Sequence, residues 1–152
     1  HDYIQKHRGE VKEMLIRAVF ARLLNGLREV HAHKLLHLDI KPSNIYLRND
    51  GTPVLLDFGA ARQTLASDQP VLKPMYTPGY AAPEQYGISQ SGKSTDIYAL
   101  GVLLNIMITG VHPSINSPKG PIKHIIQKAT NVQISRRYQS AKEMQKELRL
   151  YI

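Results

Sequence analysis

The chain has 152 residues, the length of one typical domain, with 42% apolar and 21% charged residues, a balance that excludes a disordered tail or a fibrous repeat. Lys and Arg total 20 against 12 Asp and Glu, and the formal net charge of +8 favours phosphate-bearing partners in general. The absence of cysteine excludes a disulfide framework, a thiolate zinc site and a cysteine nucleophile.

Hydrophobic periodicity predicts a first helix over residues 10–33. Its apolar residues recur at steps of three and four, which would place them on one buried stripe of the helix. The predicted stripe comprises Val11, Met14, Leu15, Ala18, Leu23, Leu27 and Val30.

A loop and a hairpin are predicted after this helix. Residues 35–44 indicate a loop, because they lack a sustained period and contain a proline. Two short apolar segments, 45–47 and 54–56, flank the turn residues 49–51 and predict a β-hairpin. Asp57 would lie just beyond the end of this hairpin.

The middle of the chain combines an irregular segment with a buried helix. Residues 59–92 are rich in Pro, Gly, Ser, Thr and Gln, and irregular segments of this length are usually functional. A helix is predicted over 95–109, with Ser94 or Thr95 as its N-cap and Gly110 as its terminator. Because this helix is apolar nearly all round, we expect it to be central and buried.

Two further helices are predicted near the C-terminus. Pro121 would open a helix that runs to Ala129. Residues 140–143 form a capping-box pattern that predicts a last helix to about Leu150. The predicted fold class is therefore mainly α with one small β-hairpin.

No membrane span or signal peptide is predicted. The longest apolar stretch, residues 97–108, contains Asn105 and is far shorter than the ~20 residues that cross a bilayer. The polar N-terminal residues lack the apolar segment of a signal peptide. We expect no membrane contact within this segment and a cytoplasmic location, although a longer parent chain could carry an anchor elsewhere.

Four polar residues around the predicted hairpin indicate metal and phosphate chemistry. Asp39 and Asn44 flank a short loop, and the hairpin folds back so that Asp57 can converge with them. Two carboxylates and an amide suit a hard cation such as Mg²⁺. Lys41 adds a positive charge at the same place, and such a set meets the needs of phosphoryl transfer.

The sequence resembles the C-terminal lobe of a bacterial-type Ser/Thr protein kinase. The likeness covers nearly the whole chain, and five motifs occur in the order that the family has them. They are the catalytic loop at 37–44, the metal-binding triplet at 57–59, Ala-Pro-Glu at 82–84, the start of the central helix at 96–101 and the late arginine motif at 136–138.

The resemblance implies a role for each residue of the predicted site. Asp39 would accept the proton of the substrate hydroxyl, and Lys41 would steady the γ-phosphate of ATP. Asn44 and Asp57 would bind Mg²⁺ or Mn²⁺. The expected function is transfer of the ATP γ-phosphate to a serine or threonine of a protein substrate.

The resemblance also implies structural roles. Thr77 and Gly79 would belong to the loop that receives the substrate residue after the phosphoacceptor, and Lys41 with Thr77 points to Ser/Thr specificity. Glu84 would pair with Arg137 inside the lobe. The residues His37, Phe58 and Asp96 would form a buried stack between the catalytic loop and the central helix.

One domain is expected over residues 1–152, divided by function. It would contain the catalytic loop (37–44), the activation segment (57–84) and a helical remainder (94–152). Only 36 residues precede the catalytic loop and no Gly-x-Gly occurs, so the family's N-lobe is expected to be missing and to be a partner of this chain. The chain alone is then expected to have almost no kinase activity.

Two further departures from the family pattern concern loops. Leu38 stands where many kinases have an arginine that binds an activation-loop phosphate, so we expect no need for phosphorylation at Thr64 or Ser67. In the alternative, Leu38 packs beneath the loop and Arg62 receives the phosphate. Only seven residues separate Pro113 from Pro121, and the family's substrate-docking helix is expected to be shortened or absent.

Several alternatives remain open. A small-molecule phosphotransferase shares the spacing of the acidic residues, and a non-catalytic pseudokinase scaffold could share the whole pattern. Nucleic-acid binding is disfavoured because the basic residues are scattered without interleaved aromatic residues. A zinc site at His33 and His37 lacks a third ligand nearby.

Overall fold

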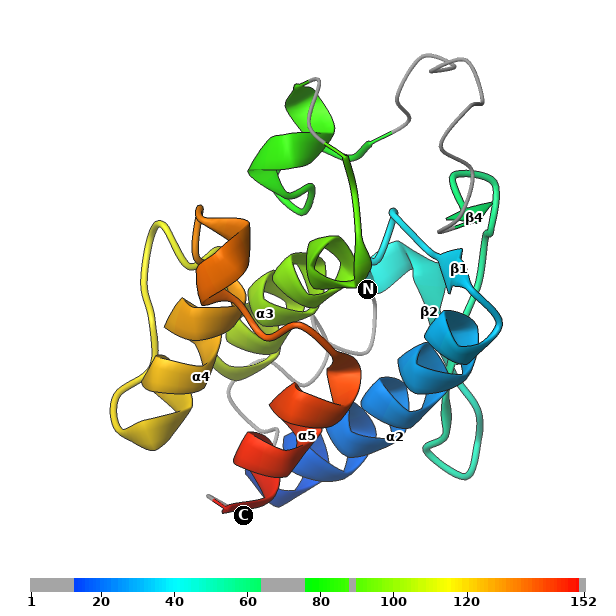
Figure 1. Ribbon diagram of the computed structural model, residues 1–152. Coiled ribbons are helices and arrows are strands. Elements are labelled where there is room, and N and C mark those ends of the chain that lie inside the picture. The colour runs from blue at the N-terminus through cyan, green and yellow to red at the C-terminus, as the bar shows by residue number, and fades with distance from the viewer. Residues whose placement is uncertain (1–12, 64–75, 88–89, 151–152) are drawn as a thin grey trace.

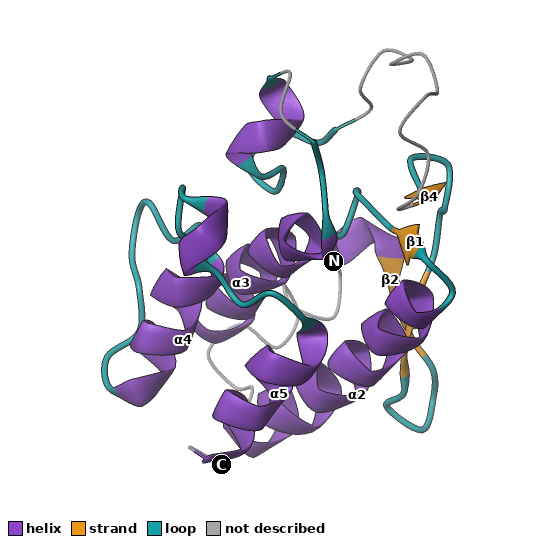
Figure 2. Ribbon diagram, viewed as in Figure 1, coloured by secondary structure: helices purple, strands orange, loops and turns teal. Residues whose placement is uncertain are grey.

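The computed structural model describes residues 13–63, 76–87 and 90–150. Helices dominate this part of the chain, and the strands lie to one side of them (Figures 1 and 2). The predicted fold class is confirmed at that level. The α-helices are α2 (Glu13–Ala32), α3 (Lys93–Thr109), α4 (Pro121–Ala129) and α5 (Ala141–Leu150).

Helix α3 is the centre of the structure, as its all-round apolar sequence predicts. Eleven of its seventeen residues are buried, because α2 and α4 both pack against it. Helix α5 runs beside α2 and also contacts α4, so the four helices enclose one apolar core (Figure 1). None of the helices among residues 13–63, 76–87 and 90–150 is both long and apolar enough to cross a membrane.

The buried face of α2 differs from the predicted stripe. Leu15 is 40% exposed and Ala18 is exposed too, whereas Leu23 and Leu27 are buried as predicted. Val11 and the side chain of Met14 lie outside the described part. The error arises because apolar residues occur on both sides of the true face, which is selected by contact with α3 and α5. Its buried apolar residues are Ile16, Val19, Phe20, Leu23, Leu24 and Leu27.

The predicted hairpin is confirmed. Strands β2 (Ile45–Leu47) and β3 (Pro53–Leu55) pair antiparallel, and the second strand ends one residue earlier than predicted. In the turn, Gly51 has a φ of 77°, a left-handed conformation that glycine adopts without steric cost. The Asp50 carboxylate accepts a hydrogen bond from the amide of Thr52 (2.9 Å) and fixes the turn.

A second strand pair was not predicted. Strands β1 (Leu35–Leu36) and β4 (Arg62–Gln63) pair antiparallel and connect the segment before Asp39 to the segment after Asp57. The 35–44 region is therefore not only loop. It contains β1 and the short 3-10 helix η1 (Pro42–Asn44). Two-residue strands are too short to produce a recognisable period.

The N-terminus of α3 begins earlier than predicted. Gly92 is the N-cap, and neither Ser94 nor Thr95 takes that role. Thr95 lies at the third helical position, where its Oγ1 accepts a hydrogen bond from the Gly92 amide (2.9 Å). The predicted terminator Gly110 is confirmed, with a φ of 77°.

The C-terminal helices begin where the sequence predicts. Pro121 opens α4, and the 111–120 segment before it contains turns but no helix, as the short Pro113–Pro121 spacing predicts. At α5, the Ser140 Oγ accepts a hydrogen bond from the Glu143 amide (3.1 Å). The Glu143 carboxylate accepts a hydrogen bond from the amide of Gln139 (2.7 Å). A capping box would instead pair it with the amide of Ser140, one residue later.

A glycine allows α3 and α4 to approach closely, and an alanine there is expected to destabilise the protein. A Cβ on Gly101 would lie 2.7 Å from the Cβ of Ala129 and 2.8 Å from the Cγ2 of Thr130. We expect Gly101→Ala to reduce the free energy of unfolding by about 1–3 kcal/mol, because the helices must separate. Urea unfolding followed by circular dichroism measures this loss.

The matched control is Gly26→Ala on α2, where an added Cβ meets no atom within 4 Å. That variant is expected to gain about 0.5–1 kcal/mol from the better helix propensity of alanine. Equal stabilities of the two variants would contradict the close approach at Gly101.

Candidate active site

Asp39 is the centre of a hydrogen-bonded group between β1 and η1. The amide of Asn44 donates from Nδ2 to the Asp39 main-chain carbonyl (2.9 Å) and to its Oδ2 (3.0 Å). The Nζ of Lys41 lies 3.3 Å from the same Oδ2. Pro42 begins η1 and turns the chain so that Asn44 faces back to Asp39. The predicted members of this loop are therefore together.

Thr77 joins this group from a segment 38 residues further along the chain. Its Oγ1 donates to Asp39 Oδ1 (2.6 Å) and accepts a hydrogen bond from Lys41 Nζ (2.7 Å). One hydroxyl thus bridges the carboxylate and the ammonium group. The arrangement shows that Asp39 can accept a hydrogen bond from an aliphatic alcohol.

Asp57 lies beside this group and is exposed. The amide of the preceding Leu56 donates to the main-chain carbonyl of Asn44 (2.8 Å), which holds the end of β3 against η1. Asp57 has a φ of 56°, and its Oδ1 accepts a hydrogen bond from the Gly59 amide (3.1 Å). Asp and Asn tolerate this left-handed conformation better than other non-glycine residues do.

The donor set of Asn44 and Asp57 fits a hard divalent cation. Because Asn44 Nδ2 faces Asp39, its amide oxygen points elsewhere and accepts no hydrogen bond within the described residues. The Oδ2 of Asp57 is likewise without a donor there. No group of three or more His, Cys, Asp or Glu side chains that could hold a metal ion occurs in the described ranges. Few protein ligands, with water and phosphate oxygens as the others, are typical of Mg²⁺.

Asp96, which lies on α3, anchors the loop at residues 37–44 to that helix. It is buried, and its Oδ2 accepts hydrogen bonds from the His37 amide (2.9 Å) and from His31 Nε2 (2.8 Å). Its Oδ1 accepts one from the Leu38 amide (2.8 Å). His37 in turn bonds the Leu56 carbonyl through Nε2 (2.9 Å). These contacts connect α2, α3, the loop and the end of β3.

Leu38 occupies a strained backbone conformation. Its φ is 64°, which costs a residue with a Cβ about 1–3 kcal/mol and persists only where the surroundings fix it. Asp96 bonds its amide, and Gln85 Nε2 donates to its carbonyl (3.0 Å). Its side chain is only 8% exposed and packs in the interior. Thr64 and Ser67 lie outside the described residues, and Arg62 is exposed.

Phe58 corrects one sequence expectation. His37 and Asp96 are buried as expected, but Phe58 is 45% exposed and is not a member of a buried stack. Its ring contacts His37 edge to face, with centroids 4.8 Å apart. The His37 ring covers only one part of Phe58, and the rest faces solvent beside the exposed Leu56.

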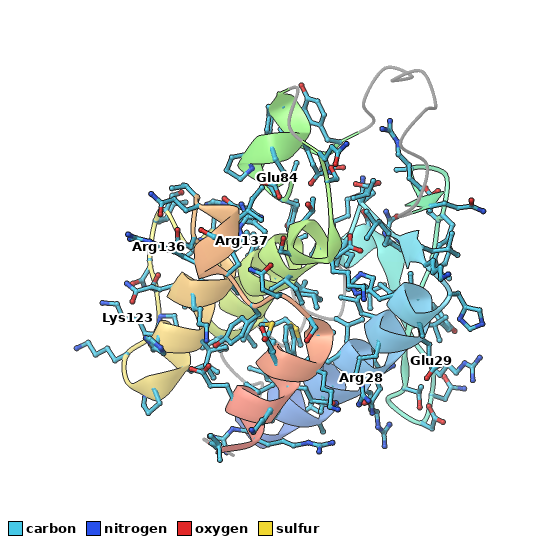
Figure 3. The ribbon with its side chains drawn as sticks, in the orientation of Figure 1. Arg28, Glu29, Glu84, Lys123, Arg136 and Arg137 are labelled. Carbon is cyan, nitrogen blue, oxygen red and sulfur yellow. The ribbon has the colours of Figure 1, made fainter. Side chains whose placement is uncertain are left out.

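Glu84 and Arg137 form a buried ion pair (Figure 3). Two parallel hydrogen bonds join them, from Nη1 to Oε1 (2.7 Å) and from Nη2 to Oε2 (2.9 Å). Thr95 donates to the same Oε1 (2.8 Å), and the Ser94 carbonyl accepts from Nη1 (3.2 Å). Burial raises the pKa of the Glu84 carboxyl, but the bonds from Arg137 and Thr95 outweigh it and hold the pKa below its usual value.

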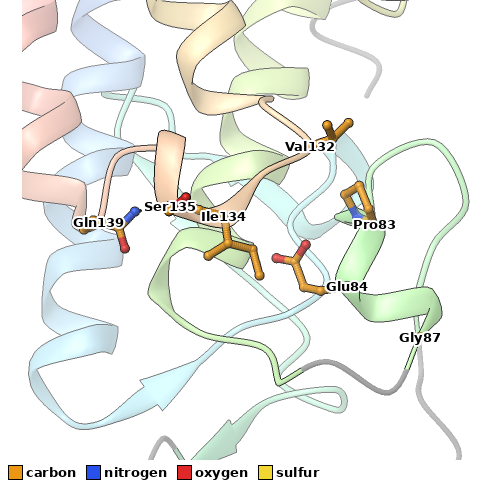
Figure 4. Close-up of a pocket in the computed structure, with 7 residues that line it drawn as sticks. All are labelled: Pro83, Glu84, Gly87, Val132, Ile134, Ser135 and Gln139. Carbon is orange, nitrogen blue, oxygen red and sulfur yellow. Dashed lines mark hydrogen bonds between the residues drawn. The ribbon is translucent and has the colours of Figure 1, made fainter.

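A shallow hollow of about 690 Å³ opens beside this pair (Figure 4). Glu84 is the one residue of the predicted site that lines it, so the hollow is separate from the Asp39 group. Its walls are Pro83, Glu84, Gly87, Val132, Ile134, Ser135 and Gln139.

Sequence reasoning missed three residues that hold the loops of this site. They are His31, Gln85 and His112, and each acts through a contact to a segment distant in sequence.

The zinc alternative is wrong for the described residues. His33 is exposed and bonds the carbonyl of Glu29 (2.8 Å), whereas His37 is buried.

This constellation of an acceptor carboxylate, a lysine, a bridging threonine and two oxygen donors suits phosphoryl transfer. The family model described as protein kinase domain matches residues 1–151. The chain belongs to the protein kinase family. The family resemblance of the sequence is thereby confirmed.

Several curated relatives of this chain are named serine/threonine-protein kinases. It is 37% identical over 115 residues to serine/threonine-protein kinase PknA of a Nostoc species, covering 71% of this chain and 20% of the relative. It is 34% identical over 151 residues to serine/threonine-protein kinase D of a Synechocystis species, covering 84% and 30%. Human ribosomal protein S6 kinase alpha-3 is 35% identical over 113 residues, covering 72% and 15%. The kinase chain thus spans 15–30% of the length of these relatives.

Proposed function

We propose that the chain forms the C-terminal lobe of a bacterial-type Ser/Thr protein kinase and takes part in moving the γ-phosphate of ATP to a protein hydroxyl. The observation that carries the proposal is the bridge from Thr77 to Asp39 (2.6 Å) and Lys41 (2.7 Å). The Thr77 hydroxyl lies within the hydrogen-bond distance at which a general base can take a proton, which supports Asp39 as the acceptor for a substrate hydroxyl.

The chemistry follows from these contacts. The oxygen of the substrate hydroxyl bonds to the γ-phosphorus, and Asp39 accepts the hydroxyl proton. The bond from that phosphorus to the β-phosphate oxygen breaks, and ADP leaves. Lys41 has a positive charge within 3.3 Å of Asp39 and would offset the charge on the transferred group. Positioning and charge stabilisation supply most of the catalysis in such reactions.

The metal ligands in this proposal are Asn44 and Asp57. Magnesium held there would neutralise the negative charge of the ATP phosphates. The Asp39 bonds fix the Asn44 amide so that its oxygen remains available, and the Leu56–Asn44 hydrogen bond keeps the two ligands on neighbouring backbone. Manganese meets the same oxygen donors and is a second candidate.

The remaining assignments follow the same proposal. Thr77 and Gly79 belong to the loop that receives the substrate, and the Lys41–Thr77 contact supports serine or threonine as the acceptor. The proposed functional segments are the catalytic loop (37–44), the activation segment (57–84) and the helical remainder (94–152).

Phosphoamino-acid analysis tests the proposal. The natural polypeptide that carries these residues is incubated with a generic protein substrate, Mg²⁺ and ATP labelled in its γ-phosphate. We expect labelled phosphoserine or phosphothreonine, and no labelling after chelation of the metal. Labelled phosphotyrosine alone would contradict the assigned specificity, and ATP binding without transfer would favour the scaffold alternative.

A further inference from the structure

A loop between α3 and α4 holds the main chain of the substrate loop. His112 Nε2 lies 2.8 Å from the carbonyl oxygen of Gly79. A carbonyl can only accept, so Nε2 must carry the proton of this bond. Within the described ranges, His112 supplies the hydrogen bond that holds this carbonyl, because the amides of Tyr80 and Ala81 turn back to Thr77 instead.

The other ring nitrogen of His112 is occupied as well. Its Nδ1 lies 3.2 Å from the main-chain amide of Ser114 and 2.8 Å from the Ser114 hydroxyl oxygen. A main-chain amide can only donate, so Nδ1 must be the unprotonated acceptor. The two contacts together assign His112 to the neutral tautomer with its proton on Nε2.

The loop that carries His112 is fixed to the buried centre of the fold. Asn105 lies on α3 with no exposed surface, and its Nδ2 donates to the carbonyls of Val111 (2.9 Å) and Asn116 (2.9 Å). Thr109 also contacts both the amide and the carbonyl of Val111 through its hydroxyl. The loop is therefore a rigid support for the imidazole rather than a free connection.

The loop segment 77–80 is held at two points by these contacts. Thr77 bonds Asp39 at one end, and the Gly79 carbonyl bonds His112 at the other. Gly79 has a φ of 88°, a conformation with little steric restriction for glycine, so contacts with other residues must fix its peptide plane.

We propose that His112 is a positioning residue for substrate binding, which sets the peptide plane at Gly79 from the core through Asn105. The inference rests on the proposed function, because it assigns residues 77–80 to the substrate loop. Loss of the bond would loosen the contact with the protein substrate while Asp39, Lys41 and Asn44 keep their own contacts. The effect should thus fall on the KM for the protein substrate.

Steady-state kinetics of the natural polypeptide test this role. His112→Phe keeps a ring but removes both hydrogen bonds, and we expect the KM for a peptide substrate to rise about three- to tenfold, the effect of one lost hydrogen bond. We expect kcat and the KM for ATP to change by less than about twofold. His112→Gln retains an amide donor and is expected to restore most of the peptide affinity.

His124→Phe is the matched control, because this exposed histidine lies on α4 and faces Glu147 instead. Equal peptide KM values for wild type and His112→Phe, or a failure of His112→Gln to rescue, would overturn the positioning role. A wild-type polypeptide without any transfer would instead overturn the proposed function and the inference together.

Nitrogen NMR of the His112 ring gives a readout that is independent of activity. We expect the long-range coupling pattern of a neutral ring protonated at Nε2, and Ser114→Ala should leave it unchanged because the Ser114 amide still donates. A neutral ring with its single proton on Nδ1 would overturn the bond to Gly79, because Nε2 would then have no proton to donate.

Discussion

Replacing Asp39 with asparagine is expected to reduce phosphoryl transfer by about 10²–10⁴-fold, the usual contribution of a general base. Asparagine cannot take the proton of the substrate hydroxyl, but its amide oxygen can still accept the bond from Thr77 or from Asn44. Asp39 is only partly buried, so the folded structure should tolerate the change. Initial rates of phosphate transfer and the midpoint of thermal unfolding, measured on the same samples, separate the two effects.

The matched control is Asp50→Asn in the β2–β3 turn. Asp50 is exposed, its carboxylate accepts the Thr52 amide, and Arg22 bonds its main-chain carbonyl, so the same substitution should leave the rate unchanged there. A fall in the unfolding midpoint of Asp39→Asn that accounts for the loss of activity would show that Asp39 caps the loop and has no catalytic role.

Replacing Glu84 with alanine is expected to cost about 3–5 kcal/mol of folding free energy. The variant leaves the guanidinium of Arg137 buried without a carboxylate among the described residues, and its remaining hydrogen bonds go to the main-chain carbonyls of Asn131, Ser94 and Val132. It also removes the acceptor of the Thr95 hydroxyl. Chemical denaturation measures the loss, and a marginally stable protein would unfold.

Glu147→Ala is the control for this pair. Glu147 contacts Lys128 and His124 at the surface, and exposed ion pairs contribute only about 0–1 kcal/mol. Comparable losses of unfolding free energy in the two variants would mean that the buried Glu84–Arg137 pair stabilises the fold no more than the Glu147 contacts do.

The pH dependence of stability provides a second test of Glu84. Its pKa in the folded protein lies below the usual 4.5 of the unfolded chain, so the unfolded state binds more protons between the two values. The stabilising contribution is therefore complete above about pH 4.5 and disappears as the pH falls through the native pKa. The stability difference between wild type and Glu84→Gln should shrink over that acid range.

The elements that sequence predicts well are those whose ends are determined by local chemistry. Pro121 begins a helix because its ring fixes φ near the helical value and it needs no hydrogen-bond partner for its nitrogen there. Gly110 ends a helix because glycine readily adopts the left-handed conformation of the C-cap. The β2–β3 hairpin follows from its turn residues in the same way. These signals need no knowledge of the rest of the fold.

The elements that were missed depend on tertiary contacts. The α2 face is selected by packing, since both Leu15 and Ile16 are apolar and only one can face the core. Thr95 has the residue type of an N-cap, but Glu84 draws its hydroxyl into the buried ion pair. Phe58 is apolar, and nothing in its local sequence indicates that nearly half of it is exposed.

The candidate site divides along the same line. The short spacing from Asp39 to Asn44 and the hairpin before Asp57 allow their proximity to be predicted. The bridge from Thr77 and the bond from His112 to Gly79 span about 30 residues or more, and only the folded chain reveals them. Sequence therefore predicts the reactive groups better than the contacts that orient them.

The carboxylate of Asp96 has a consequence for the cooperativity of the loop that begins at His37. Three donors converge on it, one on α2 and two on the loop, so the segment at His37 and Leu38 cannot open without taking two hydrogen bonds from a buried carboxylate. These two amides belong to no helix or regular strand, yet their exchange with solvent deuterium should require the same opening as that of α3. Although they lie in an irregular segment, these two amides are expected to exchange as slowly as the core helix to which they are bonded.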